Sequence, residues 1–152
     1  MIDYVPTNVY YVNELVNNLR PADRAEVEAA RGNISALQMW FDIKDAVTSV
    51  TALDDRKRVV CVYGVSRHPV QREVGVVWLL GTELLDKHMF QLCKEASAVV
   101  ASWHKLFPIL TNFTDLRNKR VLRWLQWLGF SFGPVVDMRG HQFIQFTSNR
   151  HV

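Results

Sequence analysis

The sequence has little of what marks secreted, membrane-spanning or disordered proteins. It contains two cysteines in 152 residues, Cys61 and Cys93, which are too few for a disulfide framework and are typical of a reducing compartment. No apolar run approaches the roughly 20 residues that a membrane-spanning helix needs. The first residues form neither a basic nor an apolar segment, so we expect no secretory signal. These absences favour a cytosolic protein, or one assembled from a cytosolic pool.

The motifs of several common catalytic and metal sites are missing as well. No group of His, Cys, Asp and Glu has the spacing of a zinc site, and we predict no metal. The sequence has no serine-nucleophile elbow, no P-loop and no dinucleotide-binding fingerprint. A function that depends on one of these motifs is therefore not expected.

What is present is the composition of a globular protein. Hydrophobic residues make up 49% and charged residues 22%, and 152 residues suffice for one domain with a real core. The net charge of +3 is mildly basic. The densest basic stretch lies on the polar side of a predicted helix, which favours a solvated face over a nucleic-acid surface. That stretch consists of Arg117, Lys119, Arg120 and Arg123.

The hydrophobic pattern predicts helices and strands in a compact order, without a repeat or a linker. Continuous apolar runs at 59–65 and 74–80 indicate strands that are covered on both faces. Apolar positions at helical spacing from 86 to 107 predict the longest helix, which Pro108 ends. The other predicted helices are 7–19, 21–31, 35–43 and 114–128, and the other predicted strands are 2–5, 49–53, 109–113, 130–138 and 142–147. Ser35 is expected to cap the helix 35–43, and Thr114 or Asp115 the helix that ends at Leu128.

Some side chains receive a specific prediction from this pattern. Thr7 is expected to cap the first helix, because its hydroxyl can accept a hydrogen bond from a free backbone N–H. Trp124 and Trp127 lie one turn apart, and at least one is expected to be exposed and to mark a protein–protein contact. The buried stripe of the third helix is expected to consist of Leu37, Trp40, Phe41 and Ile43.

One motif has a counterpart in a known family. Asn118 opens a predicted helix, and the run Leu128-Gly129-Phe130 ends it with a left-handed exit into the next strand. This motif and the order of the elements resemble the GNAT family of N-acetyltransferases over essentially the whole chain. The resemblance implies a single α+β domain spanning residues 1–152. Its mixed central sheet would have about six to seven strands, with helices flanking both faces.

Within that family, the sequence is most similar to small GNAT-like proteins of tailed bacteriophages, including internal virion proteins. Three segments carry this likeness: 19–26 (Leu-Arg-Pro-Ala-Asp-Arg-Ala-Glu), 78–82 (Trp-Leu-Leu-Gly-Thr) and 117–130. The resemblance implies a virion-associated structural or interaction component. Its partners would be other phage virion proteins or host proteins, and it would be found in the host cytoplasm, the virion, or both.

The resemblance also locates a cofactor site, which this sequence fills only in part. GNAT enzymes bind the pyrophosphate of acyl-CoA with a glycine-rich turn that leads into a helix. The matching positions are Leu80, Gly81 and Thr82, with Asn118 as a further cofactor-binding candidate. Only one glycine of the turn is present, and carboxylates follow it at Glu83 and Asp86, where they would repel a phosphate.

The resemblance identifies two further positions that concern catalysis. Many GNAT enzymes carry a tyrosine seven residues after the motif asparagine, and here Leu125 takes that place and cannot donate a proton. Glu73 lies where some members place a general base, but the pattern alone favours an exposed carboxylate at a strand end beside Arg72. The leading hypothesis is therefore a structural or interaction protein with a degenerate acetyltransferase site and with residual or no acyl-CoA binding. The alternative is an active N-acetyltransferase that uses acetyl-CoA.

Overall fold

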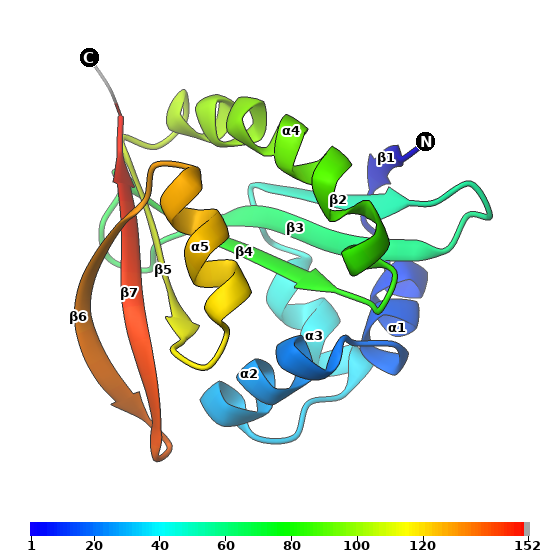
Figure 1. The fold of residues 1–152 in the computed structure, drawn as a ribbon, viewed down its shortest axis with the longest axis horizontal. Helices are drawn as coiled ribbons and strands as arrows, with labels where there is room; N and C mark the ends of the chain where they lie inside the picture. Colours follow the sequence, from blue (N-terminus) through cyan, green and yellow to red (C-terminus); the bar gives the residue numbers. More distant parts are fainter. Residues whose placement is uncertain (151–152) are drawn as a thin grey trace. The chain divides into compact units, whose positions relative to one another are not determined.

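The computed structural model describes residues 1–150, which contain five helices and seven strands (Figure 1). The helices are α1 (Val9–Asn17), α2 (Pro21–Arg31), α3 (Ala36–Ile43), α4 (Leu85–His104) and α5 (Lys119–Trp127). The strands are β1 (Asp3–Pro6), β2 (Thr48–Leu53), β3 (Val59–Arg67), β4 (Val74–Gly81), β5 (Ile109–Asp115), β6 (Ser131–Met138) and β7 (His141–Asn149). The predicted α+β class is confirmed.

The seven strands form one mixed sheet in the order β1-β2-β3-β4-β5-β7-β6. β4 and β5 run parallel, whereas β1–β2, β2–β3, β5–β7 and β6–β7 are antiparallel pairs. By its contacts the chain divides into two compact units. The first unit contains residues 1–66 and 78–89, and the second contains residues 67–77 and 90–150.

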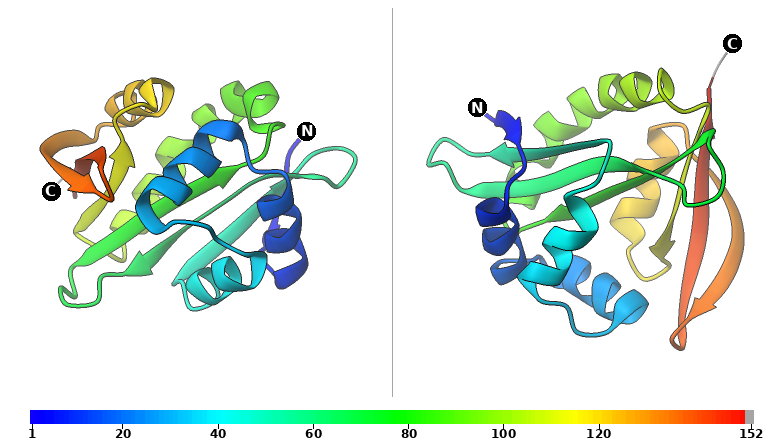
Figure 2. Two further views of the ribbon diagram at one scale, coloured as in Figure 1. Left: turned by 90° about the horizontal axis from the view of Figure 1, so that it is seen from below. Right: turned by 180° about the vertical axis from the view of Figure 1, so that it is seen from behind.

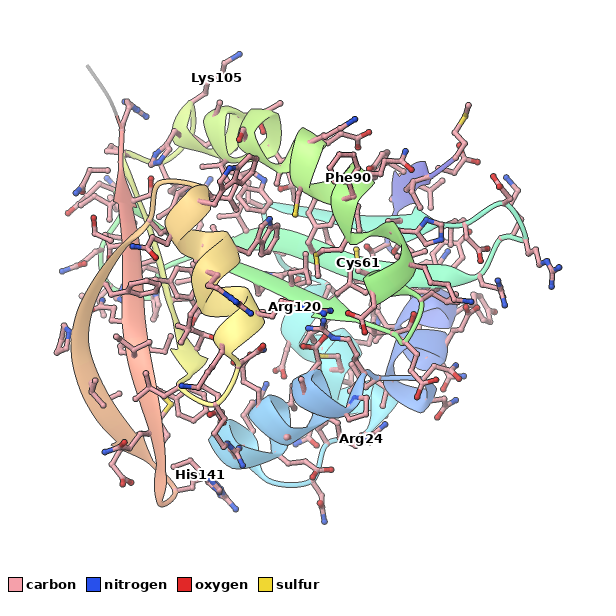
Figure 3. The ribbon with its side chains drawn as sticks, viewed as in Figure 1. Arg24, Cys61, Phe90, Lys105, Arg120 and His141 are labelled. Atoms are coloured by element: carbon pink, nitrogen blue, oxygen red, sulfur yellow. The ribbon has the colours of Figure 1, made fainter. Side chains whose placement is uncertain are left out.

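The core of the first unit is centred on β3. Val60, Cys61 and Val62 are fully buried, as a continuous apolar strand covered on both faces requires. Leu15 of α1 packs in one cluster with Val62, and α1 and α3 lie side by side (Figure 2). Burial raises the pKa of the Cys61 thiol to about 12, so this side chain (Figure 3) stays protonated and acts as a small core residue.

The first helix begins one residue later than the pattern suggested. Asn8, not Thr7, is its N-cap, and the Asn8 Oδ1 accepts a hydrogen bond of 3.0 Å from the Tyr11 N–H. The Thr7 hydroxyl instead lies 2.9 Å from the hydroxyl of Thr51 on β2. The predicted cap was wrong because pairing of β1 with β2 extends as far as Pro6 and keeps Thr7 beside the sheet.

The buried stripe predicted for α3 is confirmed at Ile43 and at the partly buried Trp40, and it is wrong at Leu37 and Phe41. Leu37 and Phe41 are 61% and 58% exposed, whereas Met39 and Ile43 are buried. The expected cap at Ser35 is confirmed, since its Oγ accepts from the backbone N–H three residues on. Positions 39 and 43 are also four residues apart, so the apolar spacing fitted two faces of the helix and did not distinguish them.

In the second unit, β5, β7 and β6 lie side by side (Figure 1). Buried Phe146 of β7 meets the ring of Phe130 edge-to-face, with 5.2 Å between the ring centroids. Phe130 directly follows Gly129, whose φ of 96° provides the left-handed helix exit that the sequence predicts. Of all the helices within residues 1–150, none is long and apolar enough to cross a lipid bilayer.

The helix of the Asn118 motif begins later than the sequence suggested. We expected Thr114 or Asp115 to cap it, but both residues still belong to β5, which pairs with β7 through Asp115. The Asp115 carboxylate accepts the Arg117 N–H at 2.9 Å and is bound by the Arg117 guanidinium. This local turn takes up the carboxylate that would otherwise cap a helix, and α5 starts only after Asn118.

Candidate functional site

The turn between β4 and α4 is the place where the sequence predicts a cofactor, and it lies within the first unit. Leu80 and Gly81 end β4, and only the three residues 82–84 separate the strand from α4. A Cβ on Gly81 would lie 2.4 Å from Cδ2 and 3.0 Å from Cβ of Leu85. Glycine is therefore needed here because the first turn of α4 lies directly against the strand end.

The backbone donors of this turn bind acceptors of the same chain. The Thr82 N–H donates to the Val60 carbonyl at 3.0 Å, and the Leu84 N–H donates to the Thr82 hydroxyl at 3.3 Å. The Gly81 N–H donates to Oδ2 of Asp23 at 2.7 Å. A GNAT pyrophosphate site would present such donors to its ligand. Here these three donors are accepted by the Asp23 carboxylate, the Val60 carbonyl of β3 and the Thr82 hydroxyl.

Asp23 belongs to a buried ion pair that the sequence reasoning missed. The Arg20 Nη2 donates to Asp23 Oδ1 at 2.9 Å, and the two side chains are only 8% and 5% exposed. The Arg20 Nη1 reaches Oδ1 of Asp86, in the first turn of α4, at 3.2 Å. One guanidinium thus joins the start of α2 to the start of α4.

The backbone holds the same segments together. The Arg20 N–H donates to the Gly81 carbonyl at 2.9 Å, and Leu19 forms an isolated antiparallel bridge with Thr82. Arg24 of α2, labelled in Figure 3, donates to the Val16 carbonyl of α1 at 2.6 Å. The connection between α1 and α2 is therefore fixed against the β4–α4 turn at several points.

The electrostatics of the pair combine burial with strong partners. Burial raises the pKa of Asp23, while Arg20 and the Gly81 N–H act in the opposite direction. For Arg20, burial alone would lower the pKa, but the hydrogen bond and charge of Asp23 raise it. Both oxygens of Asp23 accept hydrogen bonds, which is the arrangement of an ionised carboxylate bound by a cation.

Local sequence signals do not distinguish this role of Asp23. An acidic residue in the first turn of a helix that opens with Pro21 is expected for the helix dipole alone. One signal was available, because the segments 19–26 and 78–82 both carried the family resemblance. The structure joins these two segments.

The remaining predicted site residues lie in the second unit. Glu73 is exposed in the turn before β4, and its backbone carbonyl accepts from the Ile109 N–H at 3.1 Å. Asn118 precedes α5, and its Nδ2 is buried without a hydrogen-bond partner. Leu125 is 6% exposed and lies in the core of this unit. Because leucine has no hydroxyl, α5 offers no proton donor from this position.

The parallel ladder between β4 and β5 is short. Within the second unit it joins residues 74–76 to residues 109–111. Beyond it, the side-chain amide of Asn112 donates to the Val77 carbonyl at 2.7 Å. The amide thus satisfies a strand carbonyl at the point where the backbone ladder ends. No group of three or more potential metal ligands occurs in residues 1–150.

Comparison with known proteins gives structural matches only. No protein-family model matches the sequence, and no curated protein matches it. A phosphinothricin acetyltransferase of the GNAT superfamily from Sinorhizobium meliloti, in complex with AcCoA, has a TM-score of 0.75 at 13% identity. It matches 97% of this chain and 88% of its own. Spermidine N-acetyltransferase from Vibrio cholerae, in complex with CoA and spermine, has a TM-score of 0.70 at 10% identity, covering 97% and 95%.

A GNAT-family acetyltransferase from Streptococcus pneumoniae matches at a TM-score of 0.67 and 12% identity, over 98% of this chain and 99% of its own. Many further solved structures match in the same way. At such identities the likeness shows the fold. The chain therefore has the GNAT fold, as the element order predicts, and its relation to phage proteins stays a prediction.

Proposed function

We propose that this protein is an acyl-CoA-dependent N-acyltransferase. The observation that carries the proposal is the likeness of the whole chain to acetyltransferases, among them one bound to AcCoA and one bound to CoA and spermine. The proposal takes the cofactor site to be the β4–α4 turn. There, Leu80, Gly81 and Thr82 precede a 20-residue helix whose N-terminus favours anions.

The proposed chemistry is the transfer of an acyl group from the CoA thioester to an amine. Glu73 is the candidate general base, because an exposed carboxylate can accept a proton from the attacking amine, directly or through a water. Leu125 cannot protonate the departing thiolate, so water is the proton donor in this proposal. Asn118 is the candidate for a further cofactor contact, since its buried amide nitrogen still has a hydrogen bond to give.

Two measurements on the purified protein test the proposal. Thermal unfolding with and without acetyl-CoA reports binding, because a ligand at a hundred times its Kd stabilises a protein by about 2.7 kcal/mol. Release of free CoA thiol during incubation with a panel of amines reports transfer. We expect saturable binding and amine-dependent release that falls in Glu73→Gln while binding is kept. Absence of binding at millimolar acetyl-CoA would refute the proposal.

A second candidate function is a structural or interaction component without catalysis, in a phage virion or with host proteins. The specific observation in its favour is the engagement of the Gly81 N–H by Asp23. Trp127, which is 64% exposed on α5, is its candidate contact residue. If acetyl-CoA does not bind, we expect Trp127→Ala to weaken association with a partner without changing the unfolding temperature. Unchanged association would refute this contact.

A further inference from the structure

Two groups at the β4–α4 turn together bind an anion. They are the Gly81 N–H and the guanidinium of Arg20, which also contacts Asp86 in the first turn of α4. The anion already present is the side chain of Asp23, which accepts a hydrogen bond of 2.7 Å from the Gly81 N–H and one of 2.9 Å from the Arg20 guanidinium. A carboxylate of the protein itself thus lies where positive groups converge.

The carboxylate leaves one donor of this arrangement unsatisfied. Arg20 is 6% exposed, and its Nε is buried and has no hydrogen-bond partner within residues 1–150. A guanidinium offers five N–H donors in a fixed fork, and two carboxylate oxygens already bind its Nη1 and Nη2. A phosphate has more acceptor oxygens than a carboxylate and is commonly bound by the arginine fork. The unpaired Nε therefore indicates a site that can accept a richer anion than Asp23.

We propose that Asp23 is an internal competitor that occupies the anion position between Arg20 and Gly81, so that a pyrophosphate group binds there only by displacing it. The inference rests on the proposed function for the identity of the ligand, acyl-CoA. Displacement would leave Arg20 and Gly81 as the groups that hold the phosphate. Asp23 is then the residue that limits the affinity for CoA.

The experiment compares the CoA affinity of the wild type with that of Asp23→Ala and Asp23→Asn, by calorimetric titration. Asp23→Ala removes both the charge and the acceptor, whereas Asp23→Asn removes the charge and keeps an oxygen for Gly81. We expect Asp23→Ala to bind CoA at least about tenfold more tightly, because juxtaposed like charges are strongly unfavourable and each tenfold step is ~1.4 kcal/mol. Asp23→Asn should lie between the two.

Asp42→Asn is the matched control. It removes the same charge from a carboxylate of the first unit that is 36% exposed and pairs with another arginine, Arg31. We expect its CoA affinity to stay within about threefold of the wild type, because exposed charges are screened. An equal gain in Asp42→Asn and Asp23→Ala would overturn the proposal in favour of a general charge effect. Pantetheine, which lacks the pyrophosphate, should show no gain with any variant.

The outcomes separate this inference from the proposed function. If the wild type does not bind CoA but Asp23→Ala does, the inference holds and the proposed function of the wild type fails. If the wild type binds CoA and Asp23→Ala binds it no more tightly, the inference is wrong and the proposed function stands. If neither binds, both are wrong.

A measurement on the wild type covers the case in which the variants do not fold. Two-dimensional NMR during a CoA titration can follow the Gly81 amide and the Arg20 Nε–H, with the amide of Gly140 in the β6–β7 turn as a reference. We expect the first two signals to shift saturably and Gly140 to stay unchanged. Saturable shifts elsewhere in the spectrum, with Gly81 and Arg20 unchanged, would overturn the proposal.

Discussion

Neutralising one member of the buried Arg20–Asp23 pair should destabilise the protein far more than neutralising both. Asp23→Asn keeps an acceptor for the Gly81 N–H but leaves Arg20, whose side chain is 8% exposed, with only the half-exposed Asp86. Breaking a buried pair by removing one partner costs about 3–5 kcal/mol. Because Asp86 remains, we expect a loss at the lower end of that range, near ~3 kcal/mol.

The reciprocal change should be at least as severe. Arg20→Met leaves the Asp23 carboxylate buried with the Gly81 N–H as its remaining donor. The double variant Arg20→Met/Asp23→Asn has no buried charge and keeps that hydrogen bond, so we expect it to lose only about 1–2 kcal/mol. The coupling between the two sites is then about 4–5 kcal/mol, the amount by which the two single losses together exceed the loss in the double variant. The single variants should stay folded, since domains of this kind have roughly 5–15 kcal/mol of stability.

Equilibrium unfolding in urea at neutral pH measures all four corners of this double-mutant cycle. Asp86→Asn serves as a control, because its carboxylate is 49% exposed and should change the free energy of unfolding by less than about 1 kcal/mol. If the losses of the two single variants add to that of the double variant within about 0.5 kcal/mol, the two side chains do not act as a pair. That result would refute the electrostatic reasoning for this site.

Three further predictions concern stability, each checked by urea unfolding. Arg117 lowers the pKa of buried Asp115. The stability that this carboxylate contributes should therefore be present above its ordinary pKa of 3.8 and be lost as the pH falls through its lower folded value. The difference in unfolding free energy between the wild type and Asp115→Asn should vanish in acid, and a difference that stays constant with pH would contradict the prediction. Arg139 and Gly140 form the two-residue β6–β7 turn, and both have a positive φ, which favours asparagine at the first position. Arg139→Asn should therefore raise the free energy of unfolding by about 0.5–1 kcal/mol, and a lower free energy would contradict this description of the turn. Gly64→Ala places a Cβ 2.2 Å from the Thr48 carbonyl and 2.6 Å from the Trp78 ring, which should cost about 1–3 kcal/mol; an unchanged midpoint would refute the close approach.

The strands were the most predictable part of the fold. The apolar runs at 59–65 and 74–80 were confirmed as β3 and β4, because strands buried on both faces need every position to be apolar. Helix limits were less predictable where a polar residue had two possible partners. Thr7 and Asp115 both resemble helix caps in sequence, yet strand pairing and a local turn use their side chains.

The phase of α3 shows a second limit. Its apolar residues are dense enough that two different faces satisfy the helical spacing, and only packing against α1 selects Met39 and Ile43. The candidate site shows a third limit. Asp23 and Gly81 are 58 positions apart, and no local spacing predicts that a residue suited to a helix start will bind a distant strand end. The sequence indicates the turn and its single glycine, but not the Asp23 carboxylate that accepts the Gly81 N–H.

The missing glycines and the buried carboxylate are best understood together. A turn with several glycines exposes several N–H groups, and an internal carboxylate could not satisfy them all. In this turn the Thr82 hydroxyl accepts the Leu84 N–H, and Asp23 accepts the Gly81 N–H. The missing glycines leave few free N–H groups, so the turn is stable without a ligand, and the buried Asp23 carboxylate is stable because it accepts one of these N–H groups. It follows that glycines added to this turn would not by themselves make the Gly81 N–H available to a phosphate, since Asp23 would still accept its hydrogen bond.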